Sequence, residues 1–178
     1  MQPCHNKTKA MKTTLIIALT FSIYIANAQE VSLEDSTLFD FWVGDWSLTW
    51  TTADGKTEKG NNHIVKILDQ KVIQENFKDG KDSFKGTSLT VYNPRKKSWH
   101  QAWADNQGGY FDFEGRVDGD KRIFSTQVKE IAGAQVVQRM VFYDIKPNTF
   151  TWDWEQSKDG GKSWTLQWRI NYERKEKI

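Results

Sequence analysis

Cysteine, proline and histidine are scarce in this chain of 178 residues, which has one cysteine, three prolines and three histidines. The cysteine, Cys4, precedes an apolar run and lies ahead of the segment expected to fold. A domain without cysteine has no disulfide bond, no thiolate nucleophile and no cysteine-bound metal ion. We therefore expect a single domain stabilised by its core alone, which a length of about 150 residues allows.

Neither sign of charge is in excess. Lysine and arginine number 25 and aspartate and glutamate 23, for a formal net charge of +2. Removal of the first 28 residues takes away Lys7, Lys9 and Lys12 and no acidic residue, so 22 basic and 23 acidic side chains remain. Binding to nucleic acid depends on basic surface that neutralises phosphates. The sequence therefore predicts no nucleic-acid partner.

The N-terminus carries the pattern of an export signal. A basic residue precedes the apolar run 13–25, and the small residues Ala26 and Ala28 follow it. This order is typical of a cleaved signal peptide, and the run is too short for a membrane anchor, which takes about 20 residues. We predict a signal peptide over 1–28 and a single mature domain over 29–178. The mature form is then periplasmic or secreted and has no integral membrane segment.

Apolar and polar residues alternate along nearly all of the mature chain. Near its end, Trp164, Leu166, Trp168 and Ile170 share one face, and polar residues occupy the other. One apolar face and one wet face are typical of strands in an antiparallel sheet. Pairs such as Asp-Gly and Asn-Pro separate the runs and favour tight turns. The pattern predicts about ten strands, over 45–52, 58–68, 72–77, 84–93, 98–105, 110–117, 121–128, 136–145, 149–156 and 164–173.

Connections of hairpin length leave no room for the crossovers that a parallel sheet needs. Sequential strands that each have one apolar face favour a closed up-and-down antiparallel barrel, which has no exposed edges. A β-sandwich is the alternative fold. The segment 32–42 is the one helical candidate, with Ser32 as its N-cap and Leu38, Phe39 and Trp42 on one apolar side. We expect this short helix to plug one end of the barrel.

Several segments carry a resemblance to a known superfamily. Gly44 and Trp46 form a G-x-W motif at the start of the first strand, which resembles the opening of the calycins, the superfamily of lipocalins, fatty-acid-binding proteins and nitrobindins. The longer segments resemble an often exported, bacterial lipocalin-like family of unknown function over residues 36–174. They are FDFWVGDWSLTW, ILDQKVIQENF, YNPRKKSWHQAWADNQGGY and DGGKSWTLQWRINYER.

The resemblance implies a calycin-like barrel in which a late basic residue packs over the first-strand tryptophan. Arg169 or Arg174 is the candidate to lie over Trp46, as a structural contact rather than a site. The sequence departs from true lipocalins because it has no C-terminal helix and no disulfide. No specific function follows from the resemblance, since barrels of this kind have many roles.

Residues 157–164 match the Asp-box pattern S-x-D-x-G-x-x-W known from sialidase-type propellers. Propellers repeat this turn in each blade, whereas it occurs once here. The serine and aspartate side chains are suited to bonding the backbone of the turn, and the glycines to its unusual dihedral angles. We interpret it as a structural hairpin turn and not as a sign of glycosidase activity.

Polar residues in the apolar register of the strands are the candidates for a binding site. If the barrel closes, they converge on its interior beside aromatic walls, the usual composition of a small-molecule site. A buried charge requires a partner, so Glu75 and Arg139 are expected to form an ion pair. The alternative is that the register slips at a bulge or that these residues lie at an open rim. The predicted ligand-binding residues are His63, Glu75, Gln101, Trp103, Asp105, Arg139 and Trp154.

The two histidines of the mature chain argue against a metal or haem cofactor. His63 and His100 are expected on different strands and on opposite faces of the sheet. Zinc takes three or four ligands, so these two histidines make a poor zinc site. Haem needs one proximal histidine. The resemblance to nitrobindins would place the haem-binding histidine near the C-terminus, where no histidine occurs. His63 is then the single interior candidate for a haem ligand. We predict no metal and no cofactor.

Three functions stay open at this point. The first is binding of a small apolar or aromatic ligand inside the barrel. The second is a hydrolase or isomerase that uses Glu75 and Asp105, or His63, as acid and base. The third is a packed structural barrel without a ligand, because nine tryptophans are enough to crowd a small barrel. The sequence does not specify an oligomeric state.

Overall fold

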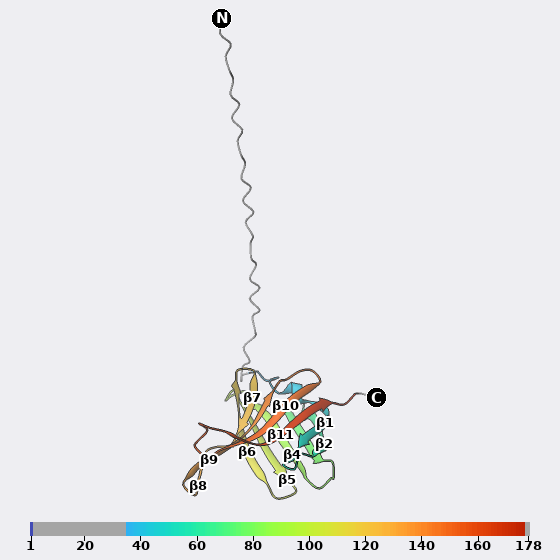
Figure 1. Ribbon diagram of the computed structural model, residues 1–178, viewed down its shortest axis with the longest axis vertical. Helices are drawn as coiled ribbons and strands as arrows, with labels where there is room; N and C mark the ends of the chain where they lie inside the picture. The colour runs from blue at the N-terminus through green and yellow to red at the C-terminus, as the bar shows by residue number, and fades with distance from the viewer. Residues whose placement is uncertain (2–34, 177–178) are drawn as a thin grey trace.

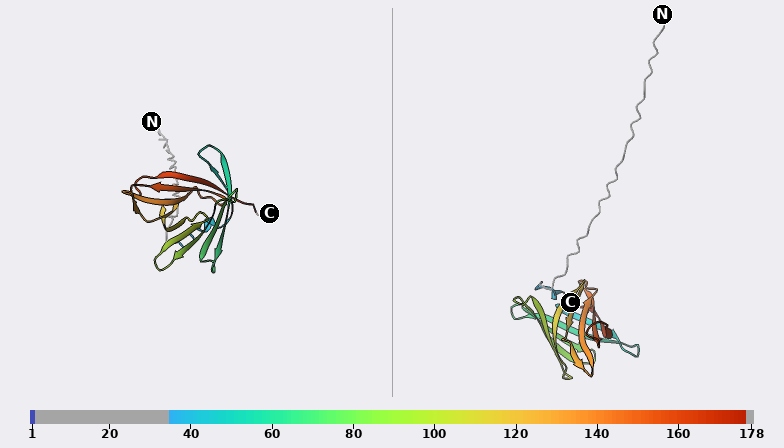
Figure 2. Two further views of the ribbon diagram at one scale, coloured as in Figure 1. Left: turned by 90° about the horizontal axis from the view of Figure 1, so that it is seen from below. Right: turned by 90° about the vertical axis from the view of Figure 1, so that its left-hand side faces the viewer.

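The computed structural model describes Met1 and residues 35–176. Ten antiparallel strands pair in a closed ring, in which the first strand also pairs with the last and β9 pairs with β10 (Figures 1 and 2). This arrangement confirms the predicted all-β antiparallel barrel. The ring consists of β1 (Gly44–Thr51), β2 (Thr57–Ile67), β3 (Val72–Asp79), β4 (Lys85–Asn93), β5 (Ser98–Asp105), β6 (Tyr110–Asp118), β7 (Lys121–Ser125), β9 (Ala134–Tyr143), β10 (Thr149–Ser157) and β11 (Thr165–Arg174).

An eleventh strand lies outside the ring. The sequence predicted one strand over 121–128, but β7 ends at Ser125 and β8 (Lys129–Ile131) pairs only with the start of β9. Ala132 and Gly133 link β8 to β9 with φ values of 50° and 79°. Two positive φ angles in succession are typical of a tight two-residue hairpin. The β8–β9 hairpin therefore projects beyond the barrel wall (Figure 1).

The predicted plug helix is wrong over the described residues. Positions 36–39 form turns, and the helical element of the described part of the chain is η1 (Asp40–Trp42), one turn of 3-10 helix. The apolar side was correctly identified, since Phe39 and Trp42 are buried. The predicted cap and the predicted signal peptide over 1–28 lie outside the described residues.

Aromatic side chains fill the end of the barrel next to η1. Phe39 is stacked on Phe124 with ring centres 4.5 Å apart, and Trp42 meets Phe142 edge to face at 5.3 Å. The indole N–H of Trp46 donates to the backbone oxygen of Trp42 over 2.8 Å. These contacts close this end, which we call the closed end of the barrel.

Arg174 lies over Trp46, which confirms one of the two arrangements expected from the calycin resemblance. Its guanidinium carbon is 4.1 Å from the ring centre, and its Nη1 donates to the backbone oxygen of Val43 over 2.8 Å. Gly44 makes room for this approach, because a Cβ at Gly44 would lie 2.1 Å from Arg174 Nη1. The contact ties the end of β11 to the start of β1.

Within the part of the chain that the structure describes, no helix is long and apolar enough to span a membrane.

A register shift between β10 and β11 changes the expected face of the last strand. Trp154 pairs with Trp168, but Glu155 pairs with Leu166, so one residue of β11 is extra. Leu166 consequently lies on the outer face with Glu155 and is exposed. Trp168 and Ile170 keep the predicted inward orientation. The predicted common face of this segment is therefore wrong before the bulge and right after it.

Candidate ligand-binding site

The end of the barrel opposite η1 contains a cavity of about 190 Å³. It lies beyond the filled aromatic layers, near the β3–β4 and β5–β6 turns. Six strands and one turn contribute to its wall, so the ring closure itself creates the space. The lining residues are mostly aromatic: Glu75, Phe77, Phe84, Trp103, Asp105, Phe111, Phe113, Met140, Trp152, Trp154, Trp168, Ile170 and Tyr172.

The aromatic rings of the wall support each other in fixed orientations. Trp152 is parallel to Trp154 at 6.5 Å and edge to face with Trp168 at 5.8 Å. Phe111 meets Trp154 edge to face at 5.5 Å. Edge-to-face and offset pairs are the preferred geometries of aromatic side chains. The wall therefore presents preformed π surfaces to whatever occupies the cavity.

Glu75 is the buried carboxyl of the cavity, with 5% of its surface exposed. It points inward from β3, and neutral side chains on both neighbouring strands bond it. Asn62 Nδ2 on β2 donates to Glu75 Oε1 over 2.7 Å, and Ser88 Oγ on β4 donates to Oε2 over 2.7 Å. Asn62 Nδ2 also donates to the Tyr172 hydroxyl oxygen over 3.2 Å. The carboxyl is thus held in place without a cationic partner among the described residues.

Burial raises the pKa of Glu75 to about 7, although the hydrogen bonds from Asn62 and Ser88 act to lower it. Removal from water penalises the charged form of a carboxyl. Burial likewise raises the pKa of Tyr172 well above its usual range, and the nearby Glu75 carboxyl adds to this effect. At neutral pH, Glu75 can therefore exchange a proton, whereas Tyr172 stays neutral.

Asp105 lines the same cavity but is bound to its own turn. Its Oδ1 accepts from the backbone N–H groups of Gln107 and Gly109, each over 2.9 Å, and its Oδ2 accepts from Trp103 Nε1 over 3.2 Å. Partial burial acts to raise the pKa of Asp105, but the bonds from Gly109, Trp103 and Gln107 lower it below its usual range. Asp105 is therefore the ionised carboxyl of the cavity.

Four of the seven predicted site residues line the cavity, namely Glu75, Trp103, Asp105 and Trp154. Gln101 is buried inside the barrel but is not among the lining residues. Its Nε2 donates to Thr90 Oγ1 over 2.8 Å, and its Oε1 has no hydrogen-bond partner among the described residues. The interior placement predicted for these five residues is correct.

The interior placement predicted for His63 is wrong. His63 is exposed on the outer face of β2, where its Nδ1 lies 2.6 Å from Asp45 Oδ1. Asn62 and Ile64 point inward instead. The sequence pattern misassigned this strand because Val65 and Ile67 on its outer face are apolar, while the inward position 62 is polar.

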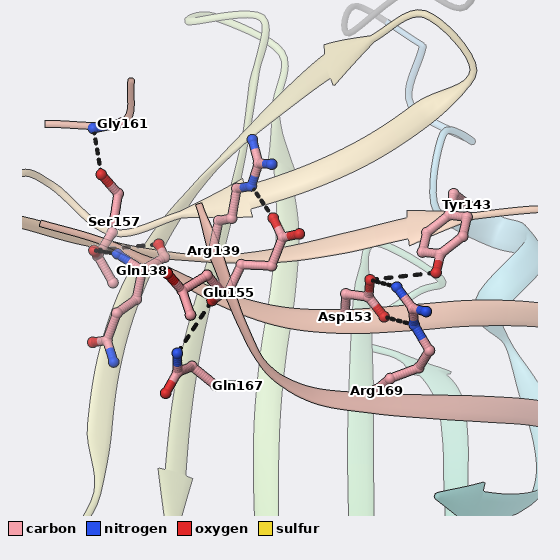
Figure 3. Close-up of polar contacts among 11 residues, drawn as sticks. Gln138, Arg139, Tyr143, Asp153, Glu155, Ser157, Gly161, Gln167 and Arg169 are labelled. Carbon is pink, nitrogen blue, oxygen red and sulfur yellow. Dashed lines mark hydrogen bonds and ion pairs between the residues drawn. The ribbon is translucent and has the colours of Figure 1, made fainter. Parts of the chain in front are cut away.

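The predicted ion pair between Glu75 and Arg139 is also wrong. Arg139 lies on the outer face of β9, where its Nε is 2.5 Å from Glu155 Oε2 (Figure 3). Its guanidinium carbon is 3.8 Å from the centre of the Trp164 ring. Val137 shares this outer face and is nevertheless buried. Because both faces of β9 are apolar, alternation could not tell which one faces the barrel interior.

A second ion pair lies on the same outer surface. Arg169 donates to both carboxylate oxygens of Asp153 over 2.6 and 2.8 Å, and the Tyr143 hydroxyl donates to Asp153 Oδ2 over 3.3 Å (Figure 3). The Asp153 carboxylate bonded to it raises the pKa of Arg169 above its usual range. This pair joins β9, β10 and β11 and has no access to the cavity.

The Asp-box segment forms a hairpin turn, as expected. Asp159 Oδ1 accepts from the backbone N–H groups of Lys162 and Ser163, each over 3.0 Å. Ser157 Oγ accepts from the N–H of Gly161 over 2.8 Å (Figure 3). Gly160 has a φ of 74° and donates its N–H to the backbone oxygen of Gln135 on β9. The turn therefore braces the barrel wall.

Several important residues were not among the predicted site residues. Asn62 and Ser88 position the Glu75 carboxyl. Each is a single polar residue in its strand, and such a residue does not by itself indicate a binding site. Tyr172 shares the inward face of Trp168 and Ile170, so continuing that alternation to the end of the strand could have identified it. The cross-strand register would have identified the other two, since Asn62 pairs with the inward-facing Phe77 and Ser88 pairs with Glu75.

Within the described ranges, no three or more His, Cys, Asp or Glu side chains are grouped so as to hold a metal ion. His63 is bonded to Asp45, and His100 Nε2 lies 3.0 Å from Ser98 Oγ. His63 and His100 thus have separate protein partners.

Comparisons with known proteins add one likeness. No protein-family model and no curated protein matches the chain. A solved structure described as "EF1p2_mFAP2b bound to DFHBI" is similar at 13% sequence identity, with a TM-score of 0.36 and coverage of 81% of this chain and 100% of that chain. A likeness of this size carries no weight for function. The barrel assignment rests on the strand pairing, and the candidate site rests on the cavity.

Proposed function

We propose that the protein binds a small aromatic or apolar molecule in the cavity of its barrel. The observation that carries this proposal is a cavity with nearly continuous aromatic walls and one buried carboxyl, Glu75, at a fixed position. Ligand sites are typically concave and apolar, with a few polar groups that set the orientation of the ligand. This cavity has that composition.

The size of the cavity limits the ligand. At about 190 Å³, it is slightly larger than a cavity of about 150 Å³ that accommodates benzene. We therefore propose a ligand with a single ring and a short substituent. The cavity also argues against a fully packed barrel, because interiors rarely contain voids larger than a water molecule.

The test is binding to the purified full chain. Native mass spectrometry is expected to show an excess mass that disappears on denaturation, and calorimetry to show saturable binding of single-ring aromatic probes. Met140→Trp fills the cavity and is expected to abolish both signals. Leu89→Trp adds the same side chain on the exposed outer face of β4 and should leave them unchanged. Absence of binding in the wild type, or equal binding by both variants, would overturn the proposal.

A second candidate function is acid–base catalysis in the same cavity. Burial raises the pKa of Glu75 to about 7, while hydrogen bonds lower that of Asp105. A pair of carboxyls whose pKa values are pushed apart is the usual arrangement of an acid and a base. Glu75 would supply the proton and Asp105 would remain ionised.

Turnover of neutral aryl esters and aryl glycosides tests this second function. Catalysis predicts that Glu75→Gln removes turnover while a neutral ligand such as 2-phenylethanol still binds. Glu114→Gln, on the exposed face of β6, serves as the matched control. Equal rates in all three proteins would reject a catalytic role for Glu75.

We also propose that the protein functions in the periplasm or after secretion, on the basis of the N-terminal pattern. N-terminal sequencing of the exported protein is expected to begin at Gln29. A mature chain that retains residues 1–28 would contradict this proposal.

A further inference from the structure

We propose that the natural ligand is an organic cation: an amine with one aromatic ring, whose ammonium group donates to Glu75 while its ring packs among the tryptophans. This inference rests on the proposed binding function and names the chemical class of its ligand. It follows from three properties of the cavity.

The first property is an uncompensated acid. Glu75 accepts from Asn62 on β2 and Ser88 on β4, both neutral. Tyr172 on β11 is the other titratable group nearby, and Asp105 lies on the cavity wall. The residues that line the cavity include no lysine, arginine or histidine. A buried carboxylate is stable only with a partner, and the cavity leaves that partner to the ligand.

The second property is the aromatic wall. Trp152 packs against both Trp154 and Trp168, and all three border the cavity on the β10–β11 side. The face of an indole ring is electronegative and attracts cations, and cages of such rings recognise ammonium groups. The wall therefore replaces part of the hydration that an ammonium group loses on entering the barrel.

The third property is the sign of the charge carried by the cavity wall. Among the described residues that line the cavity, the carboxylic acids are Glu75 and Asp105, and no basic residue accompanies them. Hydrogen bonds within the turn hold Asp105 in the ionised form. A carboxylate ligand would meet repulsion from both groups, whereas a cation would be attracted on entry and paired at Glu75. The cavity thus selects by charge as well as by size.

Three probes with one ring and similar length separate these effects: phenethylamine, 2-phenylethanol and phenylacetate. Calorimetry at pH 7.5 on the full chain is expected to show that phenethylamine binds at least about tenfold more tightly than 2-phenylethanol, and that phenylacetate does not bind. In Glu75→Gln, the preference for the amine over the alcohol should disappear. Glu114→Gln should retain it.

The pH dependence of binding gives a second readout that requires no variant. Phenethylamine is protonated throughout pH 5–8, as is a lysine side chain. Below pH 7, the amine must displace the proton of Glu75, so its affinity should rise by up to about tenfold per pH unit between pH 5 and 7 and then level off. The affinity for 2-phenylethanol should show no such rise.

The outcomes are distinguishable. Equal affinities for the amine and the alcohol, or an affinity for the amine that does not change with pH, would overturn the cationic ligand and leave the binding function intact. Absence of binding by all three probes, with no adduct in native mass spectrometry, would overturn both. A preference for phenylacetate would also reject the inference, because it requires a cation in the cavity.

Discussion

Gly86 on β4 lies directly beneath the indole ring of Trp103 on β5. A Cβ at Gly86 would be 2.0 Å from Trp103 Cζ2 and 2.3 Å from Cη2. The absent side chain thus gives the tryptophan its place in the cavity wall.

Gly86→Ala is therefore expected to displace Trp103 and to destabilise the protein by about 1–3 kcal/mol, as overpacking does. Chemical denaturation measures the change in the free energy of unfolding. The loss should be smaller when Trp103→Phe is already present, because phenylalanine lacks the two crowded atoms. Equal losses in the two backgrounds would show that the contact does not cause the destabilisation.

The raised pKa of Glu75 predicts how stability depends on pH. Its pKa increases from an ordinary value of 4.5 to about 7 on folding, so the folded state holds this proton more tightly than the unfolded state. The contribution of this carboxyl to stability is then greatest below about pH 4.5, falls as the pH rises to about 7, and levels off above that. The decrease attributable to this carboxyl is of order 3 kcal/mol.

Glu75→Gln should abolish this decrease, because glutamine keeps a neutral side chain at every pH. The free energies of unfolding of ligand-free wild type and variant are expected to converge near pH 4.5 and to diverge in favour of the variant near pH 8. A difference that stays constant from pH 4.5 to 8 would show that the carboxyl is not buried as described.

Arg174 supports the barrel where its first and last strands meet. Its guanidinium covers Trp46 and donates to three backbone oxygens, those of Phe41, Val43 and Pro147. Loss of the cation–π contact and of these bonds in Arg174→Ala is expected to destabilise the protein by about 2–4 kcal/mol. Arg95→Ala, at an exposed hairpin tip, should change stability by less than about 0.5 kcal/mol. Similar effects of the two variants in thermal or chemical denaturation would contradict this role.

The Asp-box turn is expected to be locally structural. Asp159→Ala removes the acceptor of the Lys162 and Ser163 N–H groups, so hydrogen exchange at these two amides should accelerate by about tenfold or more. Asp159→Asn keeps one side-chain oxygen and should show a smaller effect. Binding of single-ring probes should be unchanged in both variants. Loss of binding in Asp159→Ala would instead indicate that the turn shapes the cavity.

Alternation was sufficient to predict the barrel because most strands have one apolar and one polar face. It placed Trp103, Trp154 and Glu75 inside correctly, since each shares its parity with other large side chains. It failed for His63 and Arg139, which lie on strands whose outer faces are also apolar. On such strands, only the pairing with neighbouring strands identifies the inner face. The sequence of a single strand does not determine that pairing.

The site was harder to predict than the fold for a related reason. The position of the Glu75 carboxyl depends on hydrogen bonds from Asn62 and Ser88, which lie 13 residues before and after it. The face of Leu166 depends on a bulge opposite Trp154 and Glu155. A one-residue shift of this kind reverses the inward and outward positions of the preceding segment. Sequence patterns do not reveal such a shift.

The pairing of β1 with β11 has a consequence for synthesis of the chain. Trp46 lies opposite Arg174, so the outer edge of β1 has no partner until the last strand has been made. The growing chain therefore carries an open sheet edge almost to its end, a condition that favours aggregation. Closure must also bring together segments from the two ends of the barrel sequence, which makes folding slow relative to that of a helical domain. We expect this protein to depend on chaperones or on delayed folding until the complete chain is released.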